Sequence, residues 1–197
     1  MNSKPNNSTQ DIGIDNKDCA LESLGGPANQ LTLEQKQSAK IFLIDDEPII
    51  LELFSVFLCD AGFKNVSAFT DSVEAIETLR YVTPSIILTD INMPEVSGNF
   101  LIKLIRTYDH LSTTPIVAIT SNTTEEARES ILRKGADAVI HKPVDSATLC
   151  SKVSQILEST LRMNSQISEA EEREQQKVDQ KKAAVISLES SLRDMMR

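Results

Sequence analysis

The chain has 197 residues, a formal net charge of −9 and no tryptophan, with a composition otherwise ordinary for a globular protein. This length suits one domain with extensions. The acidity lies in the middle, because residues 39–160 carry a formal charge of −7, against −2 for residues 1–38 and 0 for residues 161–197. We therefore do not expect direct binding to nucleic acid, which needs clustered Lys and Arg for its phosphates.

Neither the cysteines nor the apolar runs indicate disulfide, metal-thiolate or membrane chemistry. Cys19, Cys59 and Cys150 are odd in number and far apart, which predicts reduced thiols. No apolar run is long enough to span a bilayer, and the N-terminus lacks the basic and apolar blocks of a signal peptide. The sequence therefore predicts a cytoplasmic protein with no membrane span.

Residues 1–38 form the first segment in chain order. They are rich in Asn, Ser and Gln, poor in large apolar residues, and interrupted by Gly25, Gly26 and Pro27. This composition predicts a mostly disordered polar tail. Within it, Thr32–Gln35 matches a capping box, which favours the start of a short helix.

From residue 40 onward, short apolar runs of strand type alternate with longer segments of helical spacing. Capping boxes at Asp71–Glu74 and Thr123–Glu126 predict helix starts, and Gly135 predicts a helix end. Five strands alternating with helices predict an α/β fold in which helices cover both faces of a parallel sheet. The predicted strands are Ile41–Asp45, Val66–Phe69, Ile86–Asp90, Ile116–Thr120 and Ala138–His141.

The C-terminal part contains neither Gly nor Pro after Pro143, so a helix that starts near Asp145 can continue unbroken. A first apolar seam has heptad spacing and fails at Glu174 and Lys177, and a second set resumes out of register. We expect residues 161–197 to be a helical extension that forms a coiled coil; the alternative is a solvated helix that frays after about Ala170. The two sets are Leu149, Val153, Ile156, Thr160, Met163, Ile167 and Ala170, and then Val185, Leu188, Leu192 and Met195.

Acidic residues lie where two of the predicted strands end. Asp45 and Asp46 end or follow the first strand, and Asp90 ends the third. Parallel strands end at one edge of a sheet, and ligands bind in the crevice there. Carboxylates that meet in one pocket raise each other's pKa unless a cation holds them. A hard cation with oxygen ligands resolves the conflict, and Mg²⁺ suits a site with few carboxylates and several waters.

Two further strand ends carry complementary chemistry. The fourth strand ends in Thr120 and Ser121, which are hydroxyl donors, and the fifth is followed by Lys142. A lysine and a metal ion would neutralise the charge of a phosphoryl group, and a threonine hydroxyl would donate to one of its oxygens. One of the carboxylates is then a candidate nucleophile, as in enzymes that form an aspartyl phosphate.

Four stretches of the sequence carry a resemblance to a known family: "IFLIDDEP", "IILTDINMPEVSG", "PIVAITS" and "GADAVIHKP". Through them, residues 39–160 resemble the CheY-like receiver domain of bacterial two-component response regulators. The resemblance implies a flavodoxin-like fold with strand order 2-1-3-4-5. It also implies that Asp90 accepts a phosphoryl group from a phosphohistidine.

The resemblance implies metal ligands as well. Asp46 would bind Mg²⁺ directly, Asp45 would bind it mainly through water, and Asp90 and the backbone carbonyl of Asn92 would complete the protein ligands. By the same resemblance, the phosphoryl oxygens would be held by three groups at two other strand ends. These are Thr120, the backbone amide of Ser121, and Lys142.

The resemblance further implies a cis peptide bond between Lys142 and Pro143. One position departs from the family, which usually has Tyr or Phe three residues before the lysine, where this sequence has Val139. That ring moves inward with the threonine on activation in the family. The substitution leaves the phosphorylation chemistry untouched, but the family's route by which phosphorylation reaches the surface is not implied for this chain.

These observations favour a phosphorylation-controlled switch with no effector enzyme, whose chemistry is Mg²⁺-dependent self-phosphorylation and autodephosphorylation. Its expected partners are a sensor histidine kinase or histidine phosphotransfer protein, a downstream protein, and a second copy through the C-terminal helix. An alternative is a receiver used mainly as a dimerisation or docking scaffold for that helix. A phosphatase of the haloacid-dehalogenase type is disfavoured, since it needs an Asp two residues after its nucleophile and this chain has Asn92.

Overall fold

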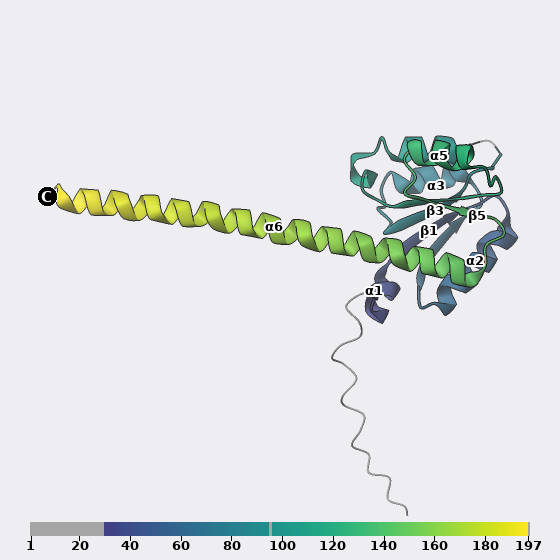
Figure 1. The fold of residues 1–197 in the computed structure, drawn as a ribbon, viewed down its shortest axis with the longest axis horizontal. Helices are drawn as coiled ribbons and strands as arrows, with labels where there is room; N and C mark the ends of the chain where they lie inside the picture. The colour runs from purple at the N-terminus through teal and green to yellow at the C-terminus, as the bar shows by residue number, and fades with distance from the viewer. Residues whose placement is uncertain (1–29, 95, 197) are drawn as a thin grey trace, which may run out of the picture. The chain divides into compact units, whose positions relative to one another are not determined.

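A five-stranded parallel sheet forms the centre of the fold (Figure 1). The computed structural model describes residues 30–94 and 96–196, and only the backbone of residues 184–195. The strand order β2-β1-β3-β4-β5 confirms the predicted topology. The strands are β1 (Lys40–Ile44), β2 (Asn65–Phe69), β3 (Ile86–Asp90), β4 (Ile116–Thr120) and β5 (Ala138–His141).

Helices cover both faces of the sheet. Helices α2 (Pro48–Asp60) and α6 (Ser146–Met195) lie on one face, while α3 (Ser72–Leu79), α4 (Gly98–Ile105) and α5 (Glu125–Arg133) lie on the other. The short helix α1 (Leu33–Ser38) precedes β1, and a 3₁₀ turn, η1 (Asp109–Leu111), precedes β4. Within the described residues, no helix is long and apolar enough to cross a membrane.

The apolar run of β1 is explained by burial on both sides. Ile41 and Leu43 face the core beneath α2 and α6, while Phe42 and Ile44 face the core beneath α3, α4 and α5. Successive strand residues point to opposite faces, so a strand covered on both sides is apolar throughout. Each buried side chain of this size contributes about 1.5–3 kcal/mol. That burial holds the end of β1, and the acidic residues after it, in a fixed place.

Helix α5 begins one residue later than the sequence predicts. Thr124, not Thr123, is its N-cap, and the Thr124 hydroxyl accepts a hydrogen bond from the backbone of Ala127. The cause lies in the preceding loop, where Asn122 Oδ1 accepts hydrogen bonds from both the backbone and the hydroxyl of Thr124. This local turn fixes the cap, which a spacing rule alone does not distinguish from its neighbour.

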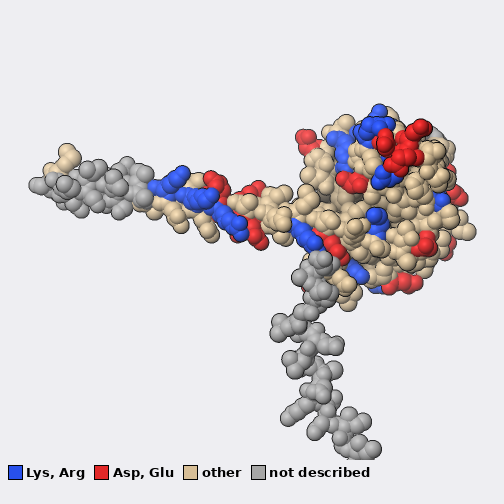
Figure 2. All heavy atoms as spheres, in the orientation of Figure 1, with Lys and Arg blue, Asp and Glu red and all other residues tan. Residues whose placement is uncertain are grey.

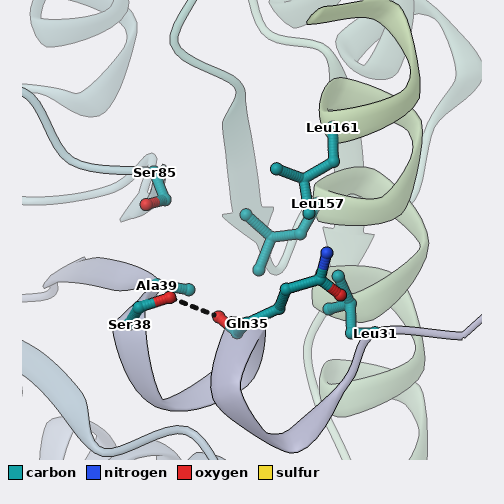
Figure 3. Close-up of a pocket in the computed structure, with 7 residues that line it drawn as sticks. All are labelled: Leu31, Gln35, Ser38, Ala39, Ser85, Leu157 and Leu161. Atoms are coloured by element: carbon teal, nitrogen blue, oxygen red, sulfur yellow. Dashed lines mark hydrogen bonds between the residues drawn. The ribbon is translucent and has the colours of Figure 1, made fainter. Parts of the chain in front are cut away.

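Within the tail that is predicted to be mostly disordered, the short helix expected at Thr32–Gln35 is present, and residues 1–29 lie outside the described part. Thr32 and Gln35 form the predicted capping box of α1. Lys36 extends the contacts, since its Nζ donates to the carbonyl of Ala61 at 3.1 Å and lies 5.7 Å from the centre of the Phe63 ring. Figure 3 shows the small pocket where α1 meets α6. These tertiary contacts hold a helix too short to persist alone.

Helix α6 runs from Ser146 to Met195 without a break, capped by Asp145 as predicted. Its first turns are buried through Leu149, Val153 and Leu157, in the core shared with α2. From residue 161 to residue 183 every side chain is exposed, and Figure 2 shows basic and acidic groups interleaved along this part. The second predicted apolar set belongs to side chains outside the described residues.

Candidate functional site

The register of the sheet brings Asp45 and Asp90 together. Ile44 of β1 pairs with Thr89 of β3, so the residues that follow them lie side by side at the carboxyl edge. Both carboxylates are buried, with 3% of Asp45 and 4% of Asp90 exposed. Two neighbouring like charges that are removed from water need a positive partner.

Lys142 supplies that positive charge. Thr120 of β4 pairs with His141 of β5, which places Lys142 one residue beyond the last pair, at the same edge. Its Nζ lies 2.9 Å from Asp45 Oδ2 and 2.8 Å from Asp90 Oδ1. The more distant and exposed Glu47 carboxylate lies 3.8 Å away. The structure thus joins three of the predicted site residues through one ammonium group.

Burial and pairing act in opposite directions on these groups. Burial raises the pKa of Asp45 above its ordinary value, although hydrogen bonds from Lys142 and the Glu47 amide oppose the shift. Burial also disfavours the charged form of Lys142, but its hydrogen bonds with Asp90 and Asp45 outweigh that effect and raise its pKa. Lys142 is therefore a charged ammonium at neutral pH, and the pKa of Asp45 stays above its ordinary value despite this positive partner.

The backbone around Asp90 fixes the carboxylate. The amide of Asn92 donates to Asp90 Oδ2, and the Thr89 hydroxyl donates to the Asp90 carbonyl at 3.0 Å. Gly98, at the start of α4, packs directly on this turn, and a Cβ there would lie 2.0 Å from the Asp90 carbonyl oxygen. Gly98 is a positioning residue that sequence reasoning missed. It stands in the quoted stretch "IILTDINMPEVSG", but only the fold reveals the close approach.

Thr120 is the hydroxyl of the site and is 1% exposed. Its Oγ1 accepts a hydrogen bond from the amide of Asn122 at 3.1 Å, which orients the hydroxyl while leaving its proton able to donate. The Lys142 amide donates to the Thr120 carbonyl at 2.9 Å, so the two residues are held together through the backbone. Ser121 follows in the exposed loop.

The predicted metal ligands are only partly assembled. Asp46 is half-buried beside Asp45, and Asn92 lies in the exposed loop after β3. Among the described residues, no group of three or more His, Cys, Asp or Glu side chains is placed to hold a metal ion. The donors are all oxygens, and the two buried carboxylates share a single ammonium. That excess of negative charge and the oxygen donors fit a hard divalent cation such as Mg²⁺.

Two further expectations concern β5 and the residues after it. The Lys142–Pro143 peptide bond is cis, which confirms the expectation. Val139 is half-buried and packs against the core beneath α3, α4 and α5. A valine has no ring to move, so this position offers no aromatic switch.

Comparison with known proteins gives one family and several relatives. Residues 41–154 match the response regulator receiver domain. Chemotaxis protein CheY-3 of Vibrio cholerae is 30% identical over 122 residues, which cover 62% of this chain and 94% of that protein. Hybrid signal transduction histidine kinase D of Dictyostelium discoideum is 31% identical over 113 residues, 57% of this chain but only 7% of that protein.

Solved structures agree with these matches. The chemotaxis response regulator CheY4 of Vibrio cholerae is 29% identical, with a TM-score of 0.57, over 60% of this chain and 98% of that one. The receiver domain of sensor histidine kinase PA1611 from Pseudomonas aeruginosa has a magnesium ion coordinated in its active-site cleft. It is 24% identical, with a TM-score of 0.56, over 60% of this chain and 97% of that one, a likeness that concerns the fold.

Proposed function

The chain belongs to the response regulator receiver domain family, and from that premise we propose that Asp90 accepts a phosphoryl group. The observation that carries this proposal is the ion pair between Lys142 and Asp90 at a buried sheet edge, with the Thr120 hydroxyl on the next strand. The family is one of signalling domains rather than of conventional enzymes, so the proposed chemistry is transfer onto the protein itself and later hydrolysis.

The proposed transfer assigns a separate role to each group. An Asp90 carboxylate oxygen forms a bond to phosphorus while the P–N bond of a phosphohistidine breaks, and the freed imidazole nitrogen takes a proton from water. The Lys142 ammonium already contacts Asp90 and can follow the charge onto a phosphoryl oxygen. The Thr120 hydroxyl and the Ser121 amide would donate to the other oxygens.

We propose Mg²⁺ as the cofactor, with Asp46, Asp90 and the Asn92 carbonyl as ligands and Asp45 bound mainly through water. Bound there, the ion would neutralise phosphoryl charge. The excess of buried carboxylate over ammonium supports this assignment. The magnesium ion in the cleft of the PA1611 receiver supports it by analogy of fold.

The proposed partners follow from the family and from α6. The phosphoryl donor would be a sensor histidine kinase or a histidine phosphotransfer protein in the cytoplasm. The output would be protein–protein contact, made by a homodimer through α6 with a downstream protein. The long exposed stretch of α6 supports the homodimer, because an isolated helix with no buried face is marginal in water.

The test is Asp90→Asn. The variant should lose all acid-labile phosphate uptake from acetyl phosphate or a phosphorylated kinase and keep its circular dichroism spectrum. Asp109→Asn, an exposed aspartate outside the site, is the matched control and should take up phosphate normally. Wild-type stoichiometry in the Asp90 variant would contradict the assignment.

The second candidate, a docking scaffold, is favoured by Val139 at the position of the usual aromatic ring. It predicts that phosphorylation changes neither the mass of the assembly nor its affinity for a partner. Sedimentation of the protein with and without beryllofluoride, a phosphoryl mimic, separates the candidates. A shift in sedimentation supports the switch, and identical profiles with full phosphate uptake favour the scaffold.

A further inference from the structure

One face of α6 stays apolar beyond the last residues that are buried against its own domain. Val153 and Leu157 are buried against the domain, and the same side of the helix continues with Thr160, Met163 and Ile167. Met163 is 62% exposed and Ile167 is 54% exposed. The helix therefore extends an apolar face past the point where its own domain can cover it.

An open groove marks the start of this uncovered face. It has a volume of about 400 Å³ and lies where the edge of the domain, at Thr113, Pro115 and Asp137, meets Met163 and Ile167 of α6. The groove is lined by the helix on one side and by the base of the sheet on the other. A second helix laid along α6 would enter there.

The spacing of the face identifies the occupant as another helix of the same kind. Met163, Ile167 and Ala170 are spaced 4 and 3, and the next apolar residue of the described part in this stripe is Val178. The distance from Ile167 to Val178 is eleven residues, which is a heptad with four residues inserted. Such an insertion locally unwinds a coiled coil without breaking either helix, and α6 is indeed unbroken there.

We propose that two copies of α6 pair in parallel and in register, with an eleven-residue step from Ile167 to Val178 joining two heptad segments. This inference rests on the proposed homodimer and assigns its interface. The seam then runs through Met163, Ile167, Ala170, Glu174 and Val178. An unbroken continuation of the first heptad would use Lys177 in place of Val178. An unbroken backward extension from Val178 would use Glu171 and Asn164 in place of Ala170 and Met163.

Antiparallel pairing of two α6 helices is disfavoured, because it needs residues that the domain already buries. An antiparallel pair aligned on the same step would set residues 188–195 of one copy beside residues 150–157 of the other. Val153 and Leu157 are already buried in their own domain and cannot pack against a second helix. In a parallel pair, the exposed stretch of one α6 instead lies beside the same stretch of the other copy.

Within the step itself, the interface has a weak layer at Glu174. In a parallel pair this carboxylate faces its copy, and like charges across a seam disfavour association. Lys177 lies on the same helix with its Nζ 3.4 Å from Glu174 Oε2, which partly offsets the repulsion. The pair should accordingly be loosest near the middle of the step.

Disulfide trapping tests the register directly. In the full chain with Cys19, Cys59 and Cys150 changed to Ser, Met163→Cys and Val178→Cys should each give a disulfide-linked dimer on mild oxidation. The matched controls are their neighbours, Asn164→Cys and Lys177→Cys, which should lose that product because they lie outside the seam. Disulfide-linked dimers from the variants at positions 163 and 177, or from those at 164 and 178, would contradict the eleven-residue step and indicate an unbroken heptad.

Sedimentation of the untreated chain keeps this inference separate from the proposed homodimer. A dimer that traps at none of the four positions overturns the parallel interface while leaving the homodimer in place. A monomer at micromolar concentration overturns both. Phosphate uptake by Asp90 is measured independently and is unaffected by either result.

Discussion

Different interactions hold the carboxyl edge of the sheet and the outer part of α6. At the edge, Asp45, Asp90 and Lys142 come from three strands and are held by burial and short contacts. Along α6 beyond residue 160, side chains are exposed, and ion pairs such as Glu169–Arg173 at 3.3 Å link residues of the same helix.

The difference shows which of the two regions is held in place by its own domain. Buried groups with opposite charges leave little freedom, so the edge is fixed by its own domain. Exposed ion pairs within a helix contribute about 0.3–0.5 kcal/mol each, which does not hold a long helix by itself. The first region is held by its own domain, and the second is exposed along the stretch from residue 161 to residue 183, which we propose a second copy covers.

The largest expected effect comes from disturbing the backbone beneath the edge. Gly98→Ala would place a Cβ 2.0 Å from the Asp90 carbonyl oxygen, so α4 must move away from the end of β3. Overpacking of this kind costs about 1–3 kcal/mol of stability. A displacement of about 1 Å at a reacting group can also cost about 100-fold in rate. Phosphorylation kinetics with acetyl phosphate and denaturant unfolding measure the two losses.

Gly62→Ala is the control for that experiment. Gly62 has a φ of +98°, so alanine is strained there, but the nearest contacts of a Cβ are at 3.4 and 3.5 Å and lie far from Asp90 in the α1 contact. It should lower stability by about 1 kcal/mol and leave the rate of phosphorylation unchanged. Equal rate losses in the two variants would mean that Gly98 acts through general stability alone.

Metal binding gives the next largest effect. Asp46→Ala should weaken Mg²⁺ binding more than Asp45→Ala, because a direct ligand contributes more than one that acts through water. Removing Asp45 also releases Lys142 to Asp90, which lies 2.8 Å away. A titration with Mg²⁺, followed by heat or by amide chemical shifts, compares the two variants. Equal losses would contradict the assigned roles.

A smaller effect is expected in stability and its dependence on pH. Burial raises the pKa of Asp45 above its ordinary value, so the folded protein binds that proton more tightly than the unfolded chain does. The ionised carboxylate therefore costs stability at neutral pH, and the cost shrinks as pH falls below the raised pKa and is gone below the ordinary pKa of an aspartate. Asp45→Asn should raise the free energy of unfolding of the metal-free protein at pH 7.

The pH series supplies the check on that gain. The advantage of Asp45→Asn over wild type should shrink as pH falls from neutral toward the ordinary pKa of an aspartate, measured by urea unfolding without Mg²⁺. A gain that is constant across this range would mean that the titration of Asp45 is not its cause.

Much of the edge could be predicted from the sequence, because it depends on patterns that are local. The runs ending at Asp45 and Asp90 are apolar throughout, which is typical of strands buried on both faces. Neighbouring strand ends then follow from the resemblance and from the rule that parallel strands share an edge. The position of Lys142 one residue beyond β5 follows in the same way.

Features that depend on distant contacts could not be predicted. The approach of Gly98 to Asp90 is set by how α4 packs on β3, and nothing in its neighbours reports it. Residues 31–38 have the composition of a disordered tail, yet the backbone amide of Leu31 meets Glu158 at 3.4 Å, a partner 127 residues away. The cap of α5 has a different, local cause: the turn in which Asn122 holds Thr124 selects the later of two neighbouring threonines, which a spacing rule does not distinguish.

The smallest expected effect is that of removing the outer part of α6, which should leave the stability of the domain nearly unchanged. A chain ending at Thr160 keeps the buried Leu149, Val153 and Leu157, so its unfolding free energy should match the full chain within about 0.5 kcal/mol. Leu157→Ala is the contrast, since truncating a buried leucine costs about 2–5 kcal/mol. Because self-association stabilises by mass action, urea unfolding should be run at low and high protein concentration. If the free energy of unfolding rises with concentration in the full chain but not in the chain ending at Thr160, self-association is located in residues 161–197. If the shortened chain is instead much less stable than the full chain even at low concentration, the extension packs on its own domain.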